Sequence, residues 1–209
     1  MQHPAKYSNK LLPIFKTYID GKKNILDPFA GTGKIKEIAP CATLLEIEPE
    51  WAKMAGAVIG DATKMPFNDN SFDAICTSPT YGNRMADHFI DHQKGKYTRN
   101  TYRHCLGRSL NKNNSGRMQW GKKYQSLHAK AWRECKRVLS KGGLFVLNIS
   151  NHIRAGKEIN VTTWHINELA AIGFKLMATH EIKTPRQRNG ANANLRVGFE
   201  SILVLENDT

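Results

Sequence analysis

The sequence predicts an α/β fold, on three observations. Short apolar runs typical of buried strands alternate with segments of helical periodicity along the chain. The first run, 25–27, enters a glycine turn at 30–33 and then a helical segment at 34–38. The chain ends in two strand-like runs with no helix between them. Strand, glycine turn and helix start together form a crevice of the kind in which open α/β sheets bind ligands.

Length and composition narrow the class of protein. The 209 residues are 40% hydrophobic, which suits one sizeable domain spanning 1–209. No apolar run approaches the roughly 20 residues that cross a bilayer, so no membrane partner is expected. The start of the chain lacks a segment of signal-peptide type. Four scattered cysteines without a CxxC pattern indicate reduced thiols and a cytoplasmic location.

The amino-terminal half contains three further strand-like runs and two helical segments besides the glycine turn. A helix is predicted from the spacing of apolar residues over 11–19, with Ser8 as its N-cap. Another helix begins at Pro49. The strands are expected at 42–47, 58–63 and 72–77.

The carboxyl-terminal half continues the alternation. A helix is expected at 127–139, ended by Lys141-Gly142-Gly143 because glycine favours helix termination, and a second at 161–172, closed by Gly173. The remaining strands are expected at 144–149, 174–179 and 200–205.

Acidic residues follow the predicted strands where a nucleoside could bind. Glu46 comes about twenty residues after Asp27, at a strand end, where a carboxylate can accept hydrogen bonds from both ribose hydroxyls. Ile47 would then pack on the adenine. Without the glycine turn, a surface glutamate would be the default interpretation.

Two motifs resemble one enzyme family. The string Asp27-Pro-Phe-Ala-Gly-Thr-Gly33 resembles the first motif of class I S-adenosylmethionine (SAM)-dependent methyltransferases that methylate exocyclic amino groups of nucleic-acid bases. The string Ser78-Pro79-Thr80-Tyr81 resembles their second motif, [DNS]-P-P-[YFW]. The resemblance implies a Rossmann-like, seven-stranded, mostly parallel sheet with its last strand antiparallel, and SAM as cofactor.

The resemblance also implies roles for individual residues. The Ser78 side chain and the Pro79 carbonyl would accept hydrogen bonds from the target amine, and Tyr81 would stack on the flipped base. Thr80 departs from the pattern, because it stands where the second proline belongs and the turn loses stiffness. The residues expected to bind the cofactor are Lys6, Asp27, Phe29, Gly31, Gly33, Glu46, Ile47, Asp61, Ala62 and Ser78.

Positive charge is concentrated after the second motif. Residues 82–141 carry fifteen Lys and Arg against three Asp and Glu, which is nearly all of the net charge of +13. Within this block, 82–128 mixes basic and aromatic residues, and a second basic loop spans 183–196. The first suits a nucleic acid, because its side chains could contact both phosphates and base faces, and the second could face the same polyanion. Besides Tyr81, the predicted substrate-binding residues are Arg84, Arg99, Arg103, Lys122, Lys123, Arg186 and Arg188.

The sequence therefore predicts a methyltransferase acting on an exocyclic amine of DNA, N6 of adenine or N4 of cytosine. No cysteine follows Pro79, which disfavours methylation of a ring carbon through a covalent intermediate. RNA base methylation and a non-catalytic SAM- or nucleic-acid-binding protein remain alternatives, whereas the basic block argues against glutamine methylation in proteins. His88 and His92 repeat the spacing of Asp87 and Asp91, but no third ligand is placed, so no metal is expected.

Overall fold

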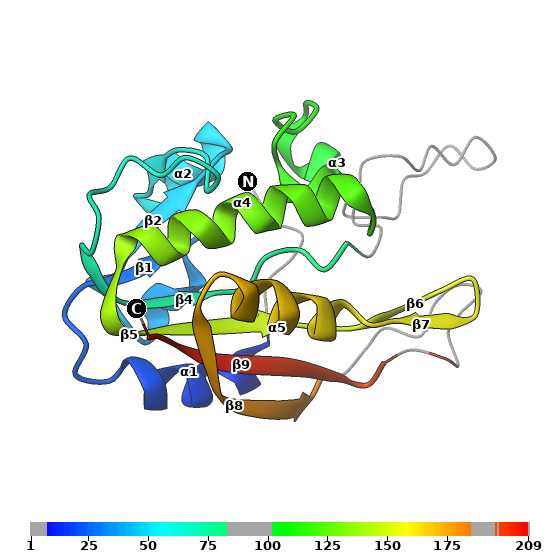
Figure 1. The fold of residues 1–209 in the computed structure, drawn as a ribbon. Coiled ribbons are helices and arrows are strands. Elements are labelled where there is room, and N and C mark those ends of the chain that lie inside the picture. The colour runs from blue at the N-terminus through cyan, green and yellow to red at the C-terminus, as the bar shows by residue number, and fades with distance from the viewer. Residues whose placement is uncertain (1–7, 83–101, 185–194, 196, 209) are drawn as a thin grey trace.

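A seven-stranded sheet forms the centre of the computed structural model, which describes residues 8–82, 102–184, 195 and 197–208 (Figure 1). The strands lie in the order β3-β2-β1-β4-β5-β9-β8. Strands β1 to β5 pair in parallel, while β9 runs antiparallel to both β5 and β8, which confirms the predicted Rossmann-like sheet. The strand bounds are β1 (Ile25–Asp27), β2 (Thr43–Glu46), β3 (Val58–Ile59), β4 (Phe72–Thr77), β5 (Leu139–Ile149), β8 (Phe174–Lys183) and β9 (Phe199–Asn207).

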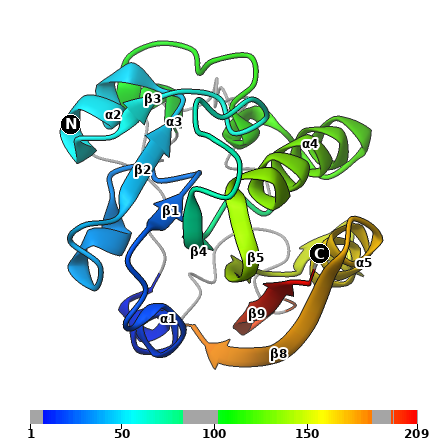
Figure 2. The same cartoon turned by 60° about the vertical axis from the view of Figure 1, so that its left-hand side comes forward.

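Helices lie on both faces of this sheet (Figure 2). Helix α1 and the short helices η1 and η2 lie on one side, and α4 and α5 cover the other. The helix bounds are η1 (Asn9–Leu11), α1 (Leu12–Ile19), η2 (Lys34–Glu37), α2 (Pro49–Ala55), α3 (Tyr102–Leu106), η3 (Ser115–Arg117), α4 (Lys122–Val138) and α5 (Val161–Ala171). None of the helices in the described ranges is long and apolar enough to cross a membrane.

The alternation of side chains along the strands divides the core into two clusters. Leu44 and Val146 point to the face covered by α1, whereas Leu45 and Phe145 point to the face covered by α4 and α5. Successive residues of a strand face opposite sides of a sheet, so near-continuous apolar runs are needed where both faces are covered. This requirement explains why the strands could be recognised in the sequence.

Helix α4 begins earlier than the sequence predicted. It starts at Lys122 rather than at 127, and its first turn buries Tyr124 on the same face as Ala131 and Cys135. Tyrosine is a weak helix former, so the apolar period alone did not extend the prediction to this turn. The earlier start brings the helix next to the turn that follows β4.

The prediction that Lys141-Gly142-Gly143 ends this helix was wrong. The helix ends at Val138, and β5 begins at once with Leu139, which pairs with Phe72 of β4. The glycines lie inside β5, within an irregularity before pairing with β4 resumes at Leu144. Gly142 has a φ of +71°, a conformation that favours glycine, so this pair supports a bulge rather than a helix stop.

Three smaller differences are local. The helix expected at 34–38 is a single 3₁₀ turn, and the third strand is limited to 58–59. A hairpin of β6 (His152–Arg154) and β7 (Lys157–Ile159) was not predicted. Its two-residue turn contains Gly156 at a φ of +74°, which is typical of tight hairpins, but the strands are too short to show a period.

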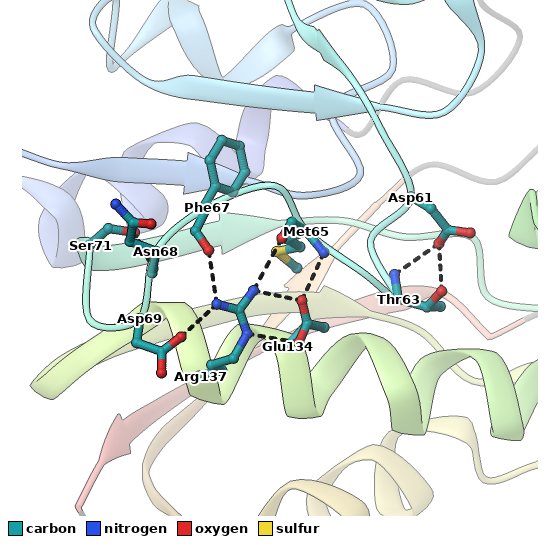
Figure 3. Close-up of polar contacts among 9 residues, drawn as sticks. All are labelled: Asp61, Thr63, Met65, Phe67, Asn68, Asp69, Ser71, Glu134 and Arg137. Carbon is teal, nitrogen blue, oxygen red and sulfur yellow. Dashed lines mark hydrogen bonds and ion pairs between the residues drawn. The ribbon is translucent and has the colours of Figure 1, made fainter.

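The loop between β3 and β4 is fixed to helix α4 by one arginine (Figure 3). Arg137 donates to the carbonyls of Met65 and Phe67 at 3.1 and 2.8 Å, and to the Asp69 carboxylate at 2.7 Å. It also pairs with both oxygens of Glu134, which in turn accepts from the Met65 amide at 2.7 Å. The planar guanidinium therefore donates to several acceptors at once, and no single neutral side chain has enough N–H donors to replace it.

Replacing this arginine should destabilise the protein. Arg137→Met leaves two carbonyls and the Glu134 carboxylate without their donor, and we expect a loss of roughly 2–4 kcal/mol in unfolding free energy. Arg133→Met is the matched control on the same helix. Within the described ranges, Arg133 is exposed and makes one ion pair, of 3.6 Å, with Glu168, so its loss should cost under about 1 kcal/mol. Equal losses in urea unfolding would contradict the role given to Arg137.

Candidate active site

A cavity of about 280 Å³ opens at the edge where the parallel strands end. The turn after β1, the end of β2 and the turn after β4 form its floor, as expected for an open α/β sheet. Residues 113–115 line it from a segment that follows α3, and Glu200 lines it from the start of β9.

The glycine turn brings backbone amides to this cavity. Gly31 has a φ of +53°, and its amide donates to Glu46 at 2.8 Å. Gly33 lies behind the turn, where a Cβ would come within 2.9 Å of the Leu44 side chain. Position 33 therefore requires glycine for two reasons: the turn packs closely on β2, and the residue has a φ of +76°.

Asp27 is buried beneath the turn rather than in the cavity lining. Its Oδ1 accepts from the Thr77 hydroxyl at 2.6 Å and from the Phe29 amide at 3.1 Å. Burial raises the pKa of this carboxyl to about 6, against the lowering effect of these hydrogen bonds. Asp27 therefore ties the glycine turn to the end of β4, where the second motif begins.

Glu46 lines the cavity, and both of its oxygens already accept a backbone hydrogen bond. Oε2 accepts from Gly31 and Oε1 accepts from the Glu48 amide, each at 2.8 Å. Burial raises the pKa of Glu46 to about 7. The amides hold the carboxylate in one orientation, and each oxygen keeps a lone pair for a hydroxyl of a ligand.

Asp61 also lines the cavity and is joined to the segment that follows α3. Its Oδ1 accepts from the amide and hydroxyl of Thr63, both at 2.8 Å, and its Oδ2 accepts from the Asn113 side chain at 2.8 Å. The carboxylate is therefore oriented from two sides, and Asn113 closes the cavity beside it.

Residues 108–117, here called the covering segment, are held over the cavity by a buried acid. Glu48 is fully buried and accepts from the Asn111 amide at 2.7 Å and from the Asn114 side chain at 2.9 Å. Arg108 pairs with Glu48 at 2.8 Å and also with Glu50. A buried carboxylate must be compensated by donors, so Glu48 fixes the position of the covering segment.

The turn after β4, residues 78–81, joins the same network through Thr80. The Thr80 hydroxyl donates to Ser115 of the covering segment at 2.9 Å, and its carbonyl accepts from the Tyr124 hydroxyl at 2.7 Å. A proline at position 80 would lack the hydroxyl that reaches Ser115. Side-chain contacts thus supply stiffness that the second proline of the motif would otherwise give.

Tyr124 is itself oriented by buried histidines. The Trp132 indole donates to His165 Nδ1 at 3.0 Å, so the other ring nitrogen carries the proton and faces the Tyr124 hydroxyl at 3.2 Å. His128 Nδ1 contacts the Tyr124 carbonyl at 2.9 Å. Burial lowers the pKa of His128 to about 4 and that of His165 well below its usual value, so both are neutral at pH 7.

A second cluster joins the turn to β5 and β9. The Asn148 amide nitrogen lies 3.0 Å from Ser78 Oγ, 2.7 Å from the Tyr81 hydroxyl and 2.8 Å from Glu200 Oε2, so its two hydrogens are shared among three oxygens. The Tyr81 hydroxyl also donates to Glu200 Oε2 at 3.0 Å. The tyrosine is therefore oriented through its hydroxyl at one end, and its ring packs partly against the core.

The structure brings most of the predicted site residues to one cavity. The predicted residues that line it are Phe29, Gly31, Glu46, Ile47, Asp61, Ala62, Ser78, Pro79 and Tyr81. Lys122 and Lys123 are exposed at the start of α4, two residues or fewer before Tyr124. The predicted residues Lys6, Arg84, Arg99, Arg186 and Arg188, the possible ligands at 87–92 and the side chain of Arg103 lie outside what the structure describes.

Sequence reasoning missed several residues of the site. Asn148 is a polar residue in the middle of an apolar strand, and Glu200 is an acid at the start of one, so both carried a visible signal. Glu48 and Asn113 carried none, because an acid before a helix and an asparagine in a polar loop are ordinary surface features.

Solved structures of low sequence identity share this fold over almost the whole chain. A SAM-dependent methyltransferase from Methanosarcina mazei has a TM-score of 0.60 at 13% identity, covering 93% of this chain and 96% of that one. The [4+2]-cyclase SpnF has a TM-score of 0.60 at 16% identity, covering 94% and 80%. A Haloferax volcanii complex between the Trm112 methyltransferase activator and a "putative methyltransferase" gives a TM-score of 0.59 at 10% identity, covering 96% and 89%. Neither a family model nor a curated protein sequence matches the chain.

The fold is that of SAM-dependent methyltransferases, and SAM is the cofactor expected in this cavity. The residues present fit that cofactor. Three acids, Glu46, Asp61 and Glu200, line the cavity against one base, Lys34, a balance that suits a ligand with a sulfonium and an ammonium group better than the phosphates of a nucleotide. The glycine turn allows close approach of the ligand to the backbone.

The buried histidines should make stability depend on pH. The folded pKa of His128, about 4, lies below the unfolded value of 6.5, so the unfolded chain binds a proton first as the pH falls. Stability is lost between about pH 6.5 and 4, by about 3 kcal/mol for this group alone. Asp27 and Glu46, whose pKa values are raised, act in the opposite direction over the same range.

A variant separates these effects. In His128→Phe the acids remain and the titrating ring is absent, so wild type should lose about 3 kcal/mol relative to the variant between pH 7.5 and 4. Urea unfolding of both proteins across this range measures the difference. A difference that does not change with pH would show that His128 is not buried in its neutral form.

Proposed function

We propose that this protein is a SAM-dependent methyltransferase that methylates an exocyclic amine of a nucleic-acid base. DNA is the favoured substrate, at N6 of adenine or N4 of cytosine, and RNA bases are the alternative. The chain would act as one domain over 1–209 that carries a basic, substrate-engaging insertion at about 82–128. A non-catalytic protein that binds SAM or nucleic acid is the rival from another class.

The observation that carries this proposal is the shared cavity. The turn 78–81, the glycine turn and Glu46 line the same space. In the strand order, β1, which leads into the glycine turn, lies between β2, which ends at Glu46, and β4, which leads into the turn 78–81. A ligand held by the glycine turn and Glu46 would therefore reach the acceptors of the second turn. The side chain of Ser78 and the carbonyl of Pro79 are the groups that would accept from the two N–H bonds of an amine.

Each residue would have a distinct role when SAM supplies an electrophilic methyl group. Glu46 would hold the ribose, and Asp61, oriented by Thr63 and Asn113, would accept from the adenine amine. Ser78 and Pro79 would direct the lone pair of the substrate nitrogen, so catalysis would come mainly from positioning. The covering segment would exclude water from the cavity.

The basic block supports a nucleic-acid substrate, although part of its charge is structural. Arg108 and Arg137 form ion pairs with acids of the same chain, so they hold the fold as well as contributing charge. Lys122 and Lys123 are exposed in the first turn of α4, just before Tyr124, whose hydroxyl binds the Thr80 carbonyl. Charge there would attract a phosphate backbone toward the cavity.

The direct test is methyl transfer. The protein is incubated with labelled SAM and single- or double-stranded DNA or RNA, and the products are identified by nucleoside mass spectrometry. Ser78→Ala should lower turnover at least tenfold, equivalent to about 1.4 kcal/mol, with SAM affinity little changed. Ser140→Ala, in the bulge of β5, is the control. Wild-type turnover in Ser78→Ala would contradict the proposed role of the turn.

The salt dependence of binding tests whether the substrate is a polyanion. The logarithm of affinity should fall linearly with the logarithm of salt concentration, by about 0.9 per phosphate contact for duplex DNA and about 0.7 for single strands. Replacing both Lys122 and Lys123 with Gln should flatten the duplex slope by up to about 1.8, whereas Lys141→Gln in β5, away from the cavity, should not. A slope near zero for every nucleic acid would favour a substrate without phosphates.

A further inference from the structure

The cavity contains an acid, Glu200, to which the proposed function assigns no step of the reaction. Three acids line it: Glu46 and Asp61 at the cofactor end, and Glu200 on the opposite side beside the turn 78–81. Glu200 is the second residue of β9, and because β9 is antiparallel, its first residues lie at the edge where the parallel strands end. Because of this topology, the Glu200 carboxylate lies beside the turn 78–81, where the amine of a substrate would bind.

Glu200 is held in place by the residues of the turn itself. Its Oε2 accepts from the Asn148 amide at 2.8 Å and from the Tyr81 hydroxyl at 3.0 Å, and the residue is only 6% exposed. A carboxylate at this depth costs several kcal/mol in lost hydration. An amide or an apolar residue would fill the space without that cost, so the carboxylate calls for an explanation.

Asn148 shows that the cluster is arranged around this acid. Its amide nitrogen faces oxygens of Ser78, Tyr81 and Glu200, while its own Oδ1 is buried and has no hydrogen-bond partner among the described residues. An unpaired buried acceptor costs about 1–3 kcal/mol. The Asn148 amide is therefore oriented so that its nitrogen stabilises Glu200 and the neighbouring hydroxyls, while its oxygen is left without a hydrogen bond.

We propose that Glu200 is a catalytic residue that accepts the proton released by the substrate amine, an inference that rests on the proposed function. The amine nitrogen forms a bond to the methyl carbon as the carbon–sulfur bond breaks and its electron pair stays on sulfur. The methylated nitrogen then carries a positive charge and one proton too many. Glu200 stabilises that charge and takes the proton, which later passes to solvent.

Ser78 cannot perform this step alone. Its hydroxyl is neutral, and its oxygen already accepts from Asn148, so it can orient an N–H bond but cannot carry away a proton at neutral pH. Its neighbour Tyr81 donates its own proton to Glu200. Glu200 is the group of this cluster that combines negative charge with a place in the cavity lining.

Turnover is the first test, with Glu200→Gln as the variant. The amide keeps an oxygen that can accept from Asn148 and Tyr81, so folding should be retained, which thermal unfolding checks. At saturating SAM, turnover on the nucleic acid that wild type methylates should fall about a hundredfold or more. Glu206→Gln, the same change near the far end of β9, is the control. Equal turnover in wild type and Glu200→Gln would overturn the proposal while leaving the function intact.

A binding test works without turnover. Sinefungin carries an ammonium group in place of the methyl-bearing sulfonium, so a carboxylate at the transfer point should favour it over S-adenosylhomocysteine. We expect a preference of at least tenfold by calorimetry in wild type and in Glu206→Gln, and its loss in Glu200→Gln. If wild type methylates no nucleic acid, the proposed function fails, and this preference alone decides whether Glu200 faces the transfer point. An equal preference in all three proteins would overturn the inference.

Discussion

Four carboxylates are buried in the described part of the chain, and all lie at the edge where the parallel strands end: Asp27, Glu46, Glu48 and Glu200. Each would be too costly to bury without donors, and the donors come from the elements that build the site. The glycine turn serves Glu46, the covering segment serves Glu48, and Asn148 with Tyr81 serves Glu200. The acids therefore determine how the loops close over the cavity.

The strands of the sheet could be predicted because the requirement for apolar residues applies to each strand separately. A strand covered on both faces must be apolar throughout, so runs such as 44–45 and 145–147 are visible without knowledge of their partners. The end of α4 could not be predicted, because Val138 and Leu139 are both apolar and only pairing with Phe72 makes the second a strand residue. Glycines 142 and 143 then misled the prediction, since a bulge and a helix stop need the same residue.

The residues of the site also divide into those that the sequence could predict and those that it could not. Glu46 ends β2, Ser78 directly follows β4 and Gly31 lies in the turn after β1. Their positions at strand ends identify the edge of the sheet that they occupy. Glu200 and Asn148 come together only because β9 inserts next to β5, across 52 residues of sequence. The sequence shows that each is unusual for a buried strand, but their meeting at the turn depends on the strand order.

Thr80 shows how a departure from a motif can be compensated by the rest of a fold. A second proline would stiffen the turn by itself, whereas Thr80 depends on Ser115 and Tyr124. Tyr124 in turn depends on a neutral His165 in a buried aromatic cluster. The geometry of the turn is thus set by the covering segment and by α4, so whatever moves either element also moves the acceptors of Ser78 and Pro79. Substrate engagement and alignment of the amine would then be one event, because the segment of the chain that carries the basic residues also holds the turn.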